Sequence, residues 1–443
     1  MKKTRLARCL ALSSLCAACL PPGVAYSSGF QVLEHSAAGL GRAFAGEAVQ
    51  TDDASVVAGN PAAMSRIKRR TVTVAGTYVN PNIDVEGTYT HSPATGGDSG
   101  PAIQKDVAPE VFVPASYFVL PTSSRWTFGA GVFTNFGLPT DYDEQSNVVE
   151  LADKTDLVSV NFNPSVAYAF SDNFSVGAGL DVVYGKVDMT STGGPTISGG
   201  MVNPGDNILS YSGSDWGLGW NIGALWQVNP ATRLGLSYRS RVHLNLRGQA
   251  SSSNFVFQDM WTDSASMGLT LPNIVELALH HQLTQTVALY ASAIRTGWHS
   301  FKTVEIKIDG LSDQGAAGAV LQPPVIEQGW HNSMRYALGA SWEYSPRWRF
   351  STGLMHDDTP TRDETRRLRI PDTDRVLATV GARYQFSDHH SIDFGYGYAW
   401  GTSKGAIDET LTGPEQLPID INTFKGSSSG NSHLASLQYN YRF

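Results

Sequence analysis

The sequence predicts an all-β fold, a transmembrane antiparallel β-barrel of about fourteen strands plugged by a small N-terminal hatch. Three features lead to this prediction: an export signal, long stretches in which apolar and polar residues alternate, and connections that are alternately tight turns and long polar loops. No run of about 18 or more apolar residues follows the signal, which excludes helical membrane spans. The closed barrel passes this test because only alternate residues of its strands face lipid.

Residues 1–27 are predicted to be a signal peptide. A cationic start at residues 2–8 precedes the apolar run Cys9 to Leu20, which is too short to span a bilayer. A lipoprotein signal acylated at Cys16 or Cys19 is the alternative, but the usual aliphatic residue three positions upstream is missing. Ordinary cleavage removes all 3 cysteines, which excludes disulfides, thiolate metal sites and cysteine catalysis.

The charge of the chain excludes one class of partner. The formal net charge is −8, and loss of the cationic signal makes the mature chain more acidic still. An acidic exported protein is a poor ligand for phosphate backbones, so no nucleic-acid partner is expected.

Residues 71–443 are predicted to form the barrel. In Asp215 to Val228 the even positions are mostly large and apolar, whereas the odd positions are glycine or polar. The same alternation occurs in residues 174–184 and 334–344. These segments run for about ten to sixteen residues, nearer to a tilted membrane strand than to a globular one, which disfavours the alternative of a soluble sandwich.

The connections are short and long in strict alternation, as expected for periplasmic turns and outer loops. Tight turns fall at 121–124, 171–173, 229–232, 283–285, 345–346 and 387–389. Long polar segments fall near 85–108, 138–154, 190–213, 247–266, 302–328, 358–373 and 404–430. The chain ends in an alternating strand with a terminal Phe443, typical of outer-membrane proteins. An ordinary soluble edge strand is the alternative, but it would expose an apolar face.

Charged residues at small or polar positions of the strands are expected to face the lumen. They are Asp181, Arg239, Arg241, Arg247, Arg335, Glu343, Arg383 and Asp393. Pairing across strands is the simplest interpretation of each. A wide aqueous pore is the other outcome for a barrel of this size.

Residues 28–70 do not fit the strand pattern. They are rich in glycine and small residues, include Asn60 and Pro61, and carry Phe30, Leu33 and Phe44. A solvated periplasmic tail is the alternative, but it would expose these apolar side chains to water, which is unfavourable. We therefore predict that this segment folds into the lumen as a hatch.

The segment SGFQVLEHSAAGLGRAFAGEAVQTDDASVVAGNPAAM resembles the N-terminal hatch of the FadL-type long-chain fatty acid and hydrocarbon transporters of Gram-negative outer membranes. Further similar segments are NFGLPTDY at 135–142, DWGLGWNIGAL at 215–225, SYRSRV at 237–242, LPNIVEL at 271–277 and IPDTDR at 370–375. The resemblance implies an outer-membrane channel for passive uptake of long-chain fatty acids or other hydrophobic compounds. Its implied partners are the cargo, outer-membrane lipid and the barrel assembly machinery, and the protein is expected to act as a monomer.

The resemblance also implies a route. Cargo is captured at outer loops, passes to a pocket beside the hatch, and leaves sideways at a kink of the third strand. On this chain the lateral opening would be formed by Phe136, Gly137, Leu138 and Pro139, where glycine and proline also interrupt strand pairing. A strand that simply ends at Pro139 is the alternative.

Three groups of residues are candidates for contact with the cargo. Phe30 follows the first mature glycine, a position that in the family lies close to the substrate. The outer segment with Phe255, Phe257 and Trp261 is an apolar cluster, although loop self-packing would explain it equally well. A fatty-acid carboxylate requires cations, for which Lys186, Lys302 and Lys307 are available, although not clearly at the family's positions; a neutral hydrocarbon requires none.

An enzyme is not predicted, and neither is a cofactor or metal. The pairs His280–His281 and His389–His390 lie outside any recognisable nucleophile motif, and neighbours in a strand point to opposite faces. A general or hydrocarbon-selective diffusion porin remains the alternative function.

Overall fold

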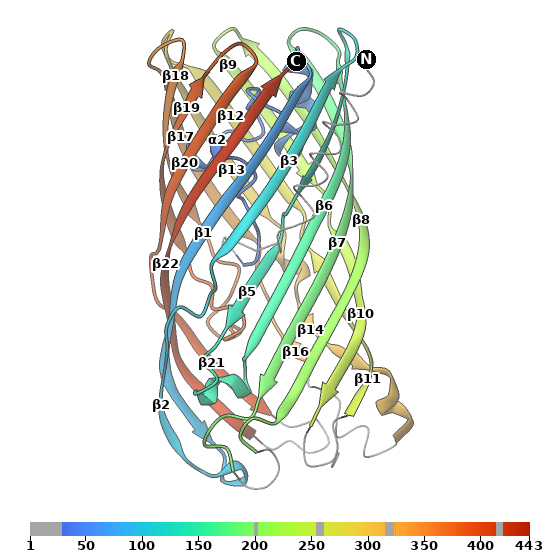
Figure 1. Ribbon diagram of the computed structural model, residues 1–443, viewed down its shortest axis with the longest axis vertical. Coiled ribbons are helices and arrows are strands. Elements are labelled where there is room, and N and C mark those ends of the chain that lie inside the picture. The colour runs from blue at the N-terminus through green and yellow to red at the C-terminus, as the bar shows by residue number, and fades with distance from the viewer. Residues whose placement is uncertain (1–28, 199–202, 254–260, 315–322, 324, 413–419) are drawn as a thin grey trace.

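The computed structural model describes residues 29–198, 203–253, 261–314, 323, 325–412 and 420–443. Within them the chain forms one closed antiparallel barrel of fourteen strands, which confirms the predicted fold class (Figure 1). The barrel closes because the last strand, β22 (Asp420–Arg442), pairs with the first, β1 (Thr71–His91), over the length of β1. No helix in the described ranges is long and apolar enough to cross a membrane.

The wall follows chain order, and several strands are divided into two elements. Its elements are β1, β3 (Val111–Pro121), β4 (Trp126–Phe133), β5 (Gly137–Asp141), β6 (Lys154–Ala169), β7 (Phe174–Thr192), β8 (Asn207–Asn229), β9 (Thr232–Arg239), β10 (Val242–Ser252), β11 (Trp261–Leu271), β12 (Ile274–Gln282), β13 (Val287–Thr296), β17 (Ser333–Glu343), β18 (Trp348–Asp357), β19 (Arg375–Gln385), β20 (His390–Gly401) and β22. The divisions at β4/β5, β9/β10 and β11/β12 are where the wall departs from a regular sheet.

The outer ends extend further as sheet than the sequence pattern suggested. β2 (Ser99–Gln104), β15 (Ile306–Ile308) and β21 (Gly405–Thr412) continue the ladders into segments predicted to be loops. β14 (Thr303–Val304) and β16 (Ile326–Glu327) form a separate small sheet. Short helices lie among them: η2 (Pro93–Thr95), η3 (Asn147–Glu150), η4 (Trp298–Ser300) and η5 (Asp309–Gln314). The sequence predicted long loops here because these segments carry many polar residues.

Several exposed aromatic residues lie near the tight turns. This end of the barrel also holds the C-terminus and is at the top of Figure 1. The backbone N–H of Phe443 donates to the carbonyl of Arg70 at 2.9 Å, so the terminal residue is held beside the start of β1. The exposed aromatic residues near these turns include Trp126, Phe170, Phe174, Trp226, Trp342, Tyr344, Trp348, Phe386 and Phe443. Such residues are typical of a membrane–water interface.

Residues 29–67 lie inside the tight-turn half of the barrel, and the exposed residues 68–70 lead to β1 (Figure 1). The enclosed residues contain α2 (Ala37–Leu40), α3 (Val56–Gly59) and the 3-10 helix η1 (Pro61–Arg66). The Ser36 hydroxyl accepts from the Gly39 N–H at the start of α2, and the Asn60 side chain accepts from the Ala62 N–H at the start of η1. These caps replace the strand partners that the segment lacks.

Glycines on the inner face of the wall let the hatch approach closely. A Cβ on Gly177 would lie 2.4 Å from the Ala62 nitrogen, and one on Gly223 would lie 1.9 Å from the Asn60 side-chain oxygen. The Asn60 amide also donates to the carbonyls of Ala48 and Ala224, at 2.7 and 3.1 Å. Asn60 and Pro61 therefore join the hatch to β7 and β8.

Candidate functional site

The most concentrated group of aromatic rings inside the barrel surrounds Phe30. We call it the aromatic cluster; its members are Phe30, Phe136, Trp298, Phe301 and Trp330. The Phe30 ring lies edge-on to Trp298 at 4.6 Å and to Phe301 at 5.4 Å, with Phe136 at 6.1 Å and Trp330 at 5.7 Å. All five side chains are buried. Phe30 thus fills the centre of an apolar space between the hatch and the wall.

The start of the hatch is held against the kink by backbone hydrogen bonds. The Gly137 N–H donates to the Phe30 carbonyl at 2.8 Å, and the Val32 N–H donates to the Asn135 carbonyl at 2.7 Å. Gly29 has φ of +66°, and a Cβ there would lie 2.7 Å from the Trp330 ring. Only glycine fits this conformation without strain, so the backbone itself carries Phe30 into the cluster.

The wall is interrupted where this contact occurs. β3 pairs with β4 only from Ser116 opposite Val132 to Pro121 opposite Thr127, and β5 pairs with β6 on its other side. Residues 134–136 turn inward between β4 and β5 and meet the hatch instead of β3. Pro114 in β3 and Pro139 in β5 have no N–H to donate, which suits strands that lack a partner on one edge.

The inside of the outer half of the barrel is apolar. Val242, Leu244 and Leu246 of β10 are buried and belong to the same apolar group as the aromatic cluster, whereas His243 and Asn245 are exposed. This inverts the arrangement in the tight-turn half, where large apolar side chains face outward. We call this interior the apolar chamber; its buried members include Phe136, Leu138, Leu157, Val183, Val187, Met267, Leu269 and Trp298.

This inversion corrects one prediction. Arg247 was expected in the lumen, but it is exposed on the outer face because the alternation changes phase at Ser240 and Arg241, between β9 and β10. The other buried lumen charges are paired as expected. Asp181 pairs with Arg239, Arg335 with Asp357, and Arg383 with Asp393.

Two polar groups in the aromatic cluster lack a partner. The ring N–H groups of Trp298 and Trp330 are buried, and no acceptor lies within hydrogen-bond distance among the described residues. Buried donors are normally satisfied, and an unpaired one costs about 1–3 kcal/mol. Both therefore provide hydrogen-bond donors for an acceptor group within an otherwise apolar space.

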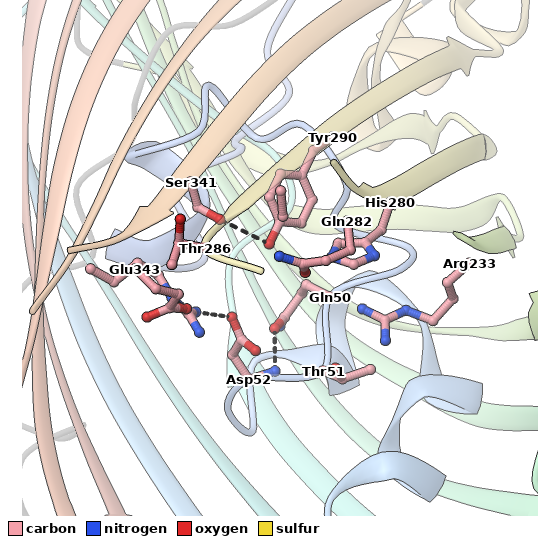
Figure 2. Close-up of a pocket in the computed structure, with 12 residues that line it drawn as sticks. Gln50, Thr51, Asp52, Arg233, His280, Gln282, Thr286, Tyr290, Ser341 and Glu343 are labelled. Atoms are coloured by element: carbon pink, nitrogen blue, oxygen red, sulfur yellow. Dashed lines mark hydrogen bonds and ion pairs between the residues drawn. The ribbon is translucent and has the colours of Figure 1, made fainter. Parts of the chain in front are cut away.

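The seam between the hatch and the opposite wall is polar. A cavity of about 220 Å³ lies between Gln50, Thr51 and Asp52 of the hatch and the inner faces of β9, β12, β13, β17 and β18 (Figure 2). Arg233, His280, Tyr290 and Glu343 project toward it in Figure 2. A space with this lining suits water and ions better than an apolar molecule.

Buried ion pairs hold the hatch at the tight-turn end. Arg383 contacts Asp53 at 2.9 Å and Asp393 at 2.5 Å, and Arg349 pairs with Asp52. Burial alone would raise the pKa of Asp52, but the guanidinium groups of Arg349 and Arg383 hold it well below its usual range. Asp52 is therefore a carboxylate at every physiological pH.

The side chains of the predicted lysines do not belong to the buried aromatic cluster, although Lys302 directly follows Phe301 in the chain. Lys186, Lys302 and Lys307 are all exposed. Lys186 pairs with Asp188 at 2.5 Å, and Lys307 with Glu305 at 3.5 Å. Lys186 in β7 and Lys307 in β15 occupy exposed strand positions, and Lys302 is exposed just before β14, so none of the three ammonium groups is buried beside Phe30.

The predicted outer capture cluster is mostly outside the described residues. Phe255 and Phe257 lie in the range 254–260, which is not described, and Trp261 is described only as the first residue of β11. Its role stays a prediction. In the described ranges, no group of three or more His, Cys, Asp or Glu side chains is placed to hold a metal ion.

Comparisons with known proteins place this geometry in context. Residues 18–443 match the profile of a family described as outer membrane protein transport protein (OMPP1/FadL/TodX). A long-chain fatty acid transport protein of Escherichia coli is 32% identical over 406 residues, covering 85% of this chain and 88% of the relative. A 47 kDa outer membrane protein of Pasteurella multocida is 33% identical over 441 residues, 95% of each chain. The crystal structure of a Pseudomonas aeruginosa FadL homologue superposes with a TM-score of 0.80 at 23% identity, covering 94% of this chain and 100% of that one.

Proposed function

This chain belongs to the OMPP1/FadL/TodX family of outer-membrane transport proteins, and from that premise we propose that its cargo is a long-chain fatty acid. The family comprises transporters and channels rather than enzymes, and the protein is located in the outer membrane. The observation that carries the proposal is the position of the aromatic cluster. It lies inside the apolar chamber and directly against the inward kink of the wall.

The route we propose leads from the outer loops into the apolar chamber and then sideways into the membrane. Phe136, Gly137, Leu138 and Pro139 form the lateral opening, and Phe30 leaves the chamber when cargo arrives. Capture takes place at the outer segment with Phe255, Phe257 and Trp261. An apolar solute gains free energy by moving from water to the bilayer, at about 0.8 kcal/mol per buried CH₂, so the route needs no energy source.

A path straight through the hatch is disfavoured by its lining. The cavity at the seam is bordered by Asp52, Arg233, Glu343 and Arg349. An alkyl chain that displaced water from these groups would leave charges without partners, which costs several kcal/mol for each. Asn60 and Pro61 hold the hatch against the wall, so the hatch closes the aqueous route while the kink provides an apolar one.

The unpaired indole donors support a cargo that carries an acceptor. The ring N–H groups of Trp298 and Trp330 would bind a carboxylate or a protonated carboxyl at the end of an alkyl chain. A pure hydrocarbon would leave both donors unsatisfied. Relatives above 30% identity include one named as a long-chain fatty acid transport protein. We further propose that the barrel assembly machinery inserts the protein and that it acts as a monomer.

Reconstitution tests this function. Vesicles containing the purified protein are expected to take up a long-chain fatty acid faster than empty vesicles, while a planar bilayer containing it stays nearly closed to ions. Steady ion conduction would indicate a general porin. Uptake of an alkane or an aromatic hydrocarbon without uptake of the fatty acid would indicate a hydrocarbon-selective channel.

A further inference from the structure

A second stretch of wall lacks regular strand pairing. β8 pairs with β9 as far as Asn221 opposite Arg239, and with β10 from Ser214 opposite Arg247. Between these ladders lie residues 215–220 of β8 and residues 240–246 on the neighbouring side, and the two stretches differ in length. We call this stretch, residues 215–220 and 240–246, the interval. The register of the two strands shifts across it, and the sheet is not continuous there.

Side chains bridge the interval at its two ends. The Trp220 N–H donates to the Ser240 hydroxyl at 2.9 Å, and the Asn245 N–H donates to the Asp215 carboxylate at 2.7 Å. The Ser240 N–H also donates to the Trp220 carbonyl at 2.8 Å. These contacts hold the edges together more weakly than a full ladder, because only a few hydrogen bonds must break to separate them.

The interval exists because β10 lies inward of the wall. A Cβ on Gly217 would lie 2.5 Å from the Val242 side chain, and one on Gly219 would lie 2.7 Å from it. A Cβ on Gly185 of β7 would lie 2.5 Å from the Leu244 side chain. These glycines leave room for Val242 and Leu244 to cross behind β8, so the glycines of DWGLGW have a packing function.

The interval joins apolar surfaces on both sides of the wall. On the outside, the Trp216 and Leu218 side chains are 66% and 69% exposed. On the inside, Val242 and Leu244 belong to the apolar chamber that also contains Phe30 and Trp298. The Trp216 ring lies 5.1 Å from the Tyr184 ring, an aromatic pair of the kind found at a membrane interface.

We propose that the interval between β8 and β10 is a second lateral opening, through which a long-chain fatty acid passes between the apolar chamber and the outer leaflet. This inference rests on the proposed function. The alkyl chain crosses between Gly217–Gly219 and Val242–Leu244. The exposed side chains of His243 and Asn245 in β10 form hydrogen bonds with its head group at the surface.

Covalent closure of each opening separates the two routes. All cysteines of the chain lie in residues 1–27, so introduced pairs are unique in the mature barrel. Leu218→Cys with His243→Cys spans the second interval. Pro114→Cys with Thr134→Cys spans the kink, because these residues lie just beyond the last ladder pair on each strand, Ser116 opposite Val132. Each pair is bridged with a short bifunctional thiol reagent, and uptake of a long-chain fatty acid into vesicles is measured before and after bridging.

The control pair is Ala178→Cys with Ile222→Cys, which face each other in the continuous ladder of β7 and β8. Bridging the control pair is expected to leave uptake unchanged. Bridging the kink should leave a residual uptake, and bridging both openings should reduce it at least threefold further, to the level of empty vesicles. Uptake that vanishes when the kink alone is bridged would overturn the second opening.

A photolabel gives a reading that does not depend on transport. A fatty acid with a diazirine on its alkyl chain should modify residues 215–220 and 240–246 in the unbridged protein within vesicles. Labelling confined to the kink and the aromatic cluster would overturn the second opening while leaving the proposed function intact. An absence of uptake and of labelling throughout the unmodified protein would overturn both.

Discussion

The Phe30 ring lies edge-on to the Trp298 ring at a centroid distance of 4.6 Å, so a hatch residue occupies the centre of the space proposed for cargo. The cargo and Phe30 therefore compete for one position. The hatch is a closed state that binding must displace, rather than a fixed floor beneath an empty pocket.

Phe30→Ala is expected to raise the affinity for a long-chain fatty acid about fivefold to tenfold, since displacing a buried ring costs on the order of 1–2 kcal/mol. Quenching of tryptophan fluorescence measures the binding. Phe44→Ala is the matched control, because Phe44 is also a buried hatch residue but packs in a different apolar group. Weaker binding by Phe30→Ala would show that the ring contacts the cargo instead of blocking it.

Trp298→Phe and Trp330→Phe keep an aromatic ring and remove the unpaired N–H. The double variant is expected to bind a fatty acid at least tenfold more weakly, because a factor of ten is about 1.4 kcal/mol and a hydrogen bond to a charged group contributes at least about that much. Its affinity for the alkane of the same length, which lacks the carboxyl group, should not change. Calorimetry on both ligands makes the comparison, and an equal loss for the two would mean that packing, not hydrogen bonding, is affected.

Arg383→Met removes the cation between Asp53 and Asp393, both of which are buried. Leaving buried carboxylates unpaired costs about 3–5 kcal/mol, so the hatch should detach and the barrel should conduct ions. Single-channel recording measures this. The control is Arg347→Met, at an exposed turn position, and closed channels in both variants would contradict a role of the ion pairs in holding the hatch.

The docked hatch is expected to lose stability as the pH rises from about 4.5 to 7. Burial raises the pKa of Glu34 to about 7 and, together with nearby Glu276 and Asp53, that of Glu47 to about 7. An undocked carboxyl keeps a pKa near 4.5. Between about pH 4.5 and 7 the docked hatch therefore binds more protons than the undocked one, and docking becomes weaker as rising pH removes these protons. Above about pH 7 the effect levels off.

Hydrogen exchange of hatch amides at pH 5 and pH 8, corrected for the intrinsic rate, measures this change. Glu47→Gln should remove part of the pH dependence, whereas Glu144→Gln, at an exposed loop position, should not. A hatch equally protected at both pH values in the wild type would contradict the prediction.

The strands of the barrel wall could be predicted from the sequence, but the residues that meet in the apolar chamber could not. Alternation in Asp215 to Val228 identified β8 and its outer face, because lipid on one side imposes a period of two. Phe30 and the kink at Phe136 to Pro139 came from the family resemblance. The barrel fold, the family and the outer-membrane location are confirmed; the roles of individual residues stay predictions.

Trp298 and Trp330 were missed because nothing local marks them. They lie outside regular strands, and only the long-range closure of the barrel brings them to Phe30. The inversion in β10 had a detectable signal in the segment VHLNLRG. If the alternation of β9 continued, the apolar residues Val242, Leu244 and Leu246 would face outward, but they face the interior. A phase change after Ser240 would have indicated that the strand moves inward and that Arg247 faces out.

The most direct test of lateral release is fatty-acid uptake by the protein bridged across its kink. With Pro114→Cys and Thr134→Cys joined by a short thiol reagent in vesicles, uptake is expected to fall by more than half, and cleavage of a reducible reagent should restore it. Uptake unchanged by this bridge, with complete bridging verified by mass spectrometry, would contradict release through the kinked strand.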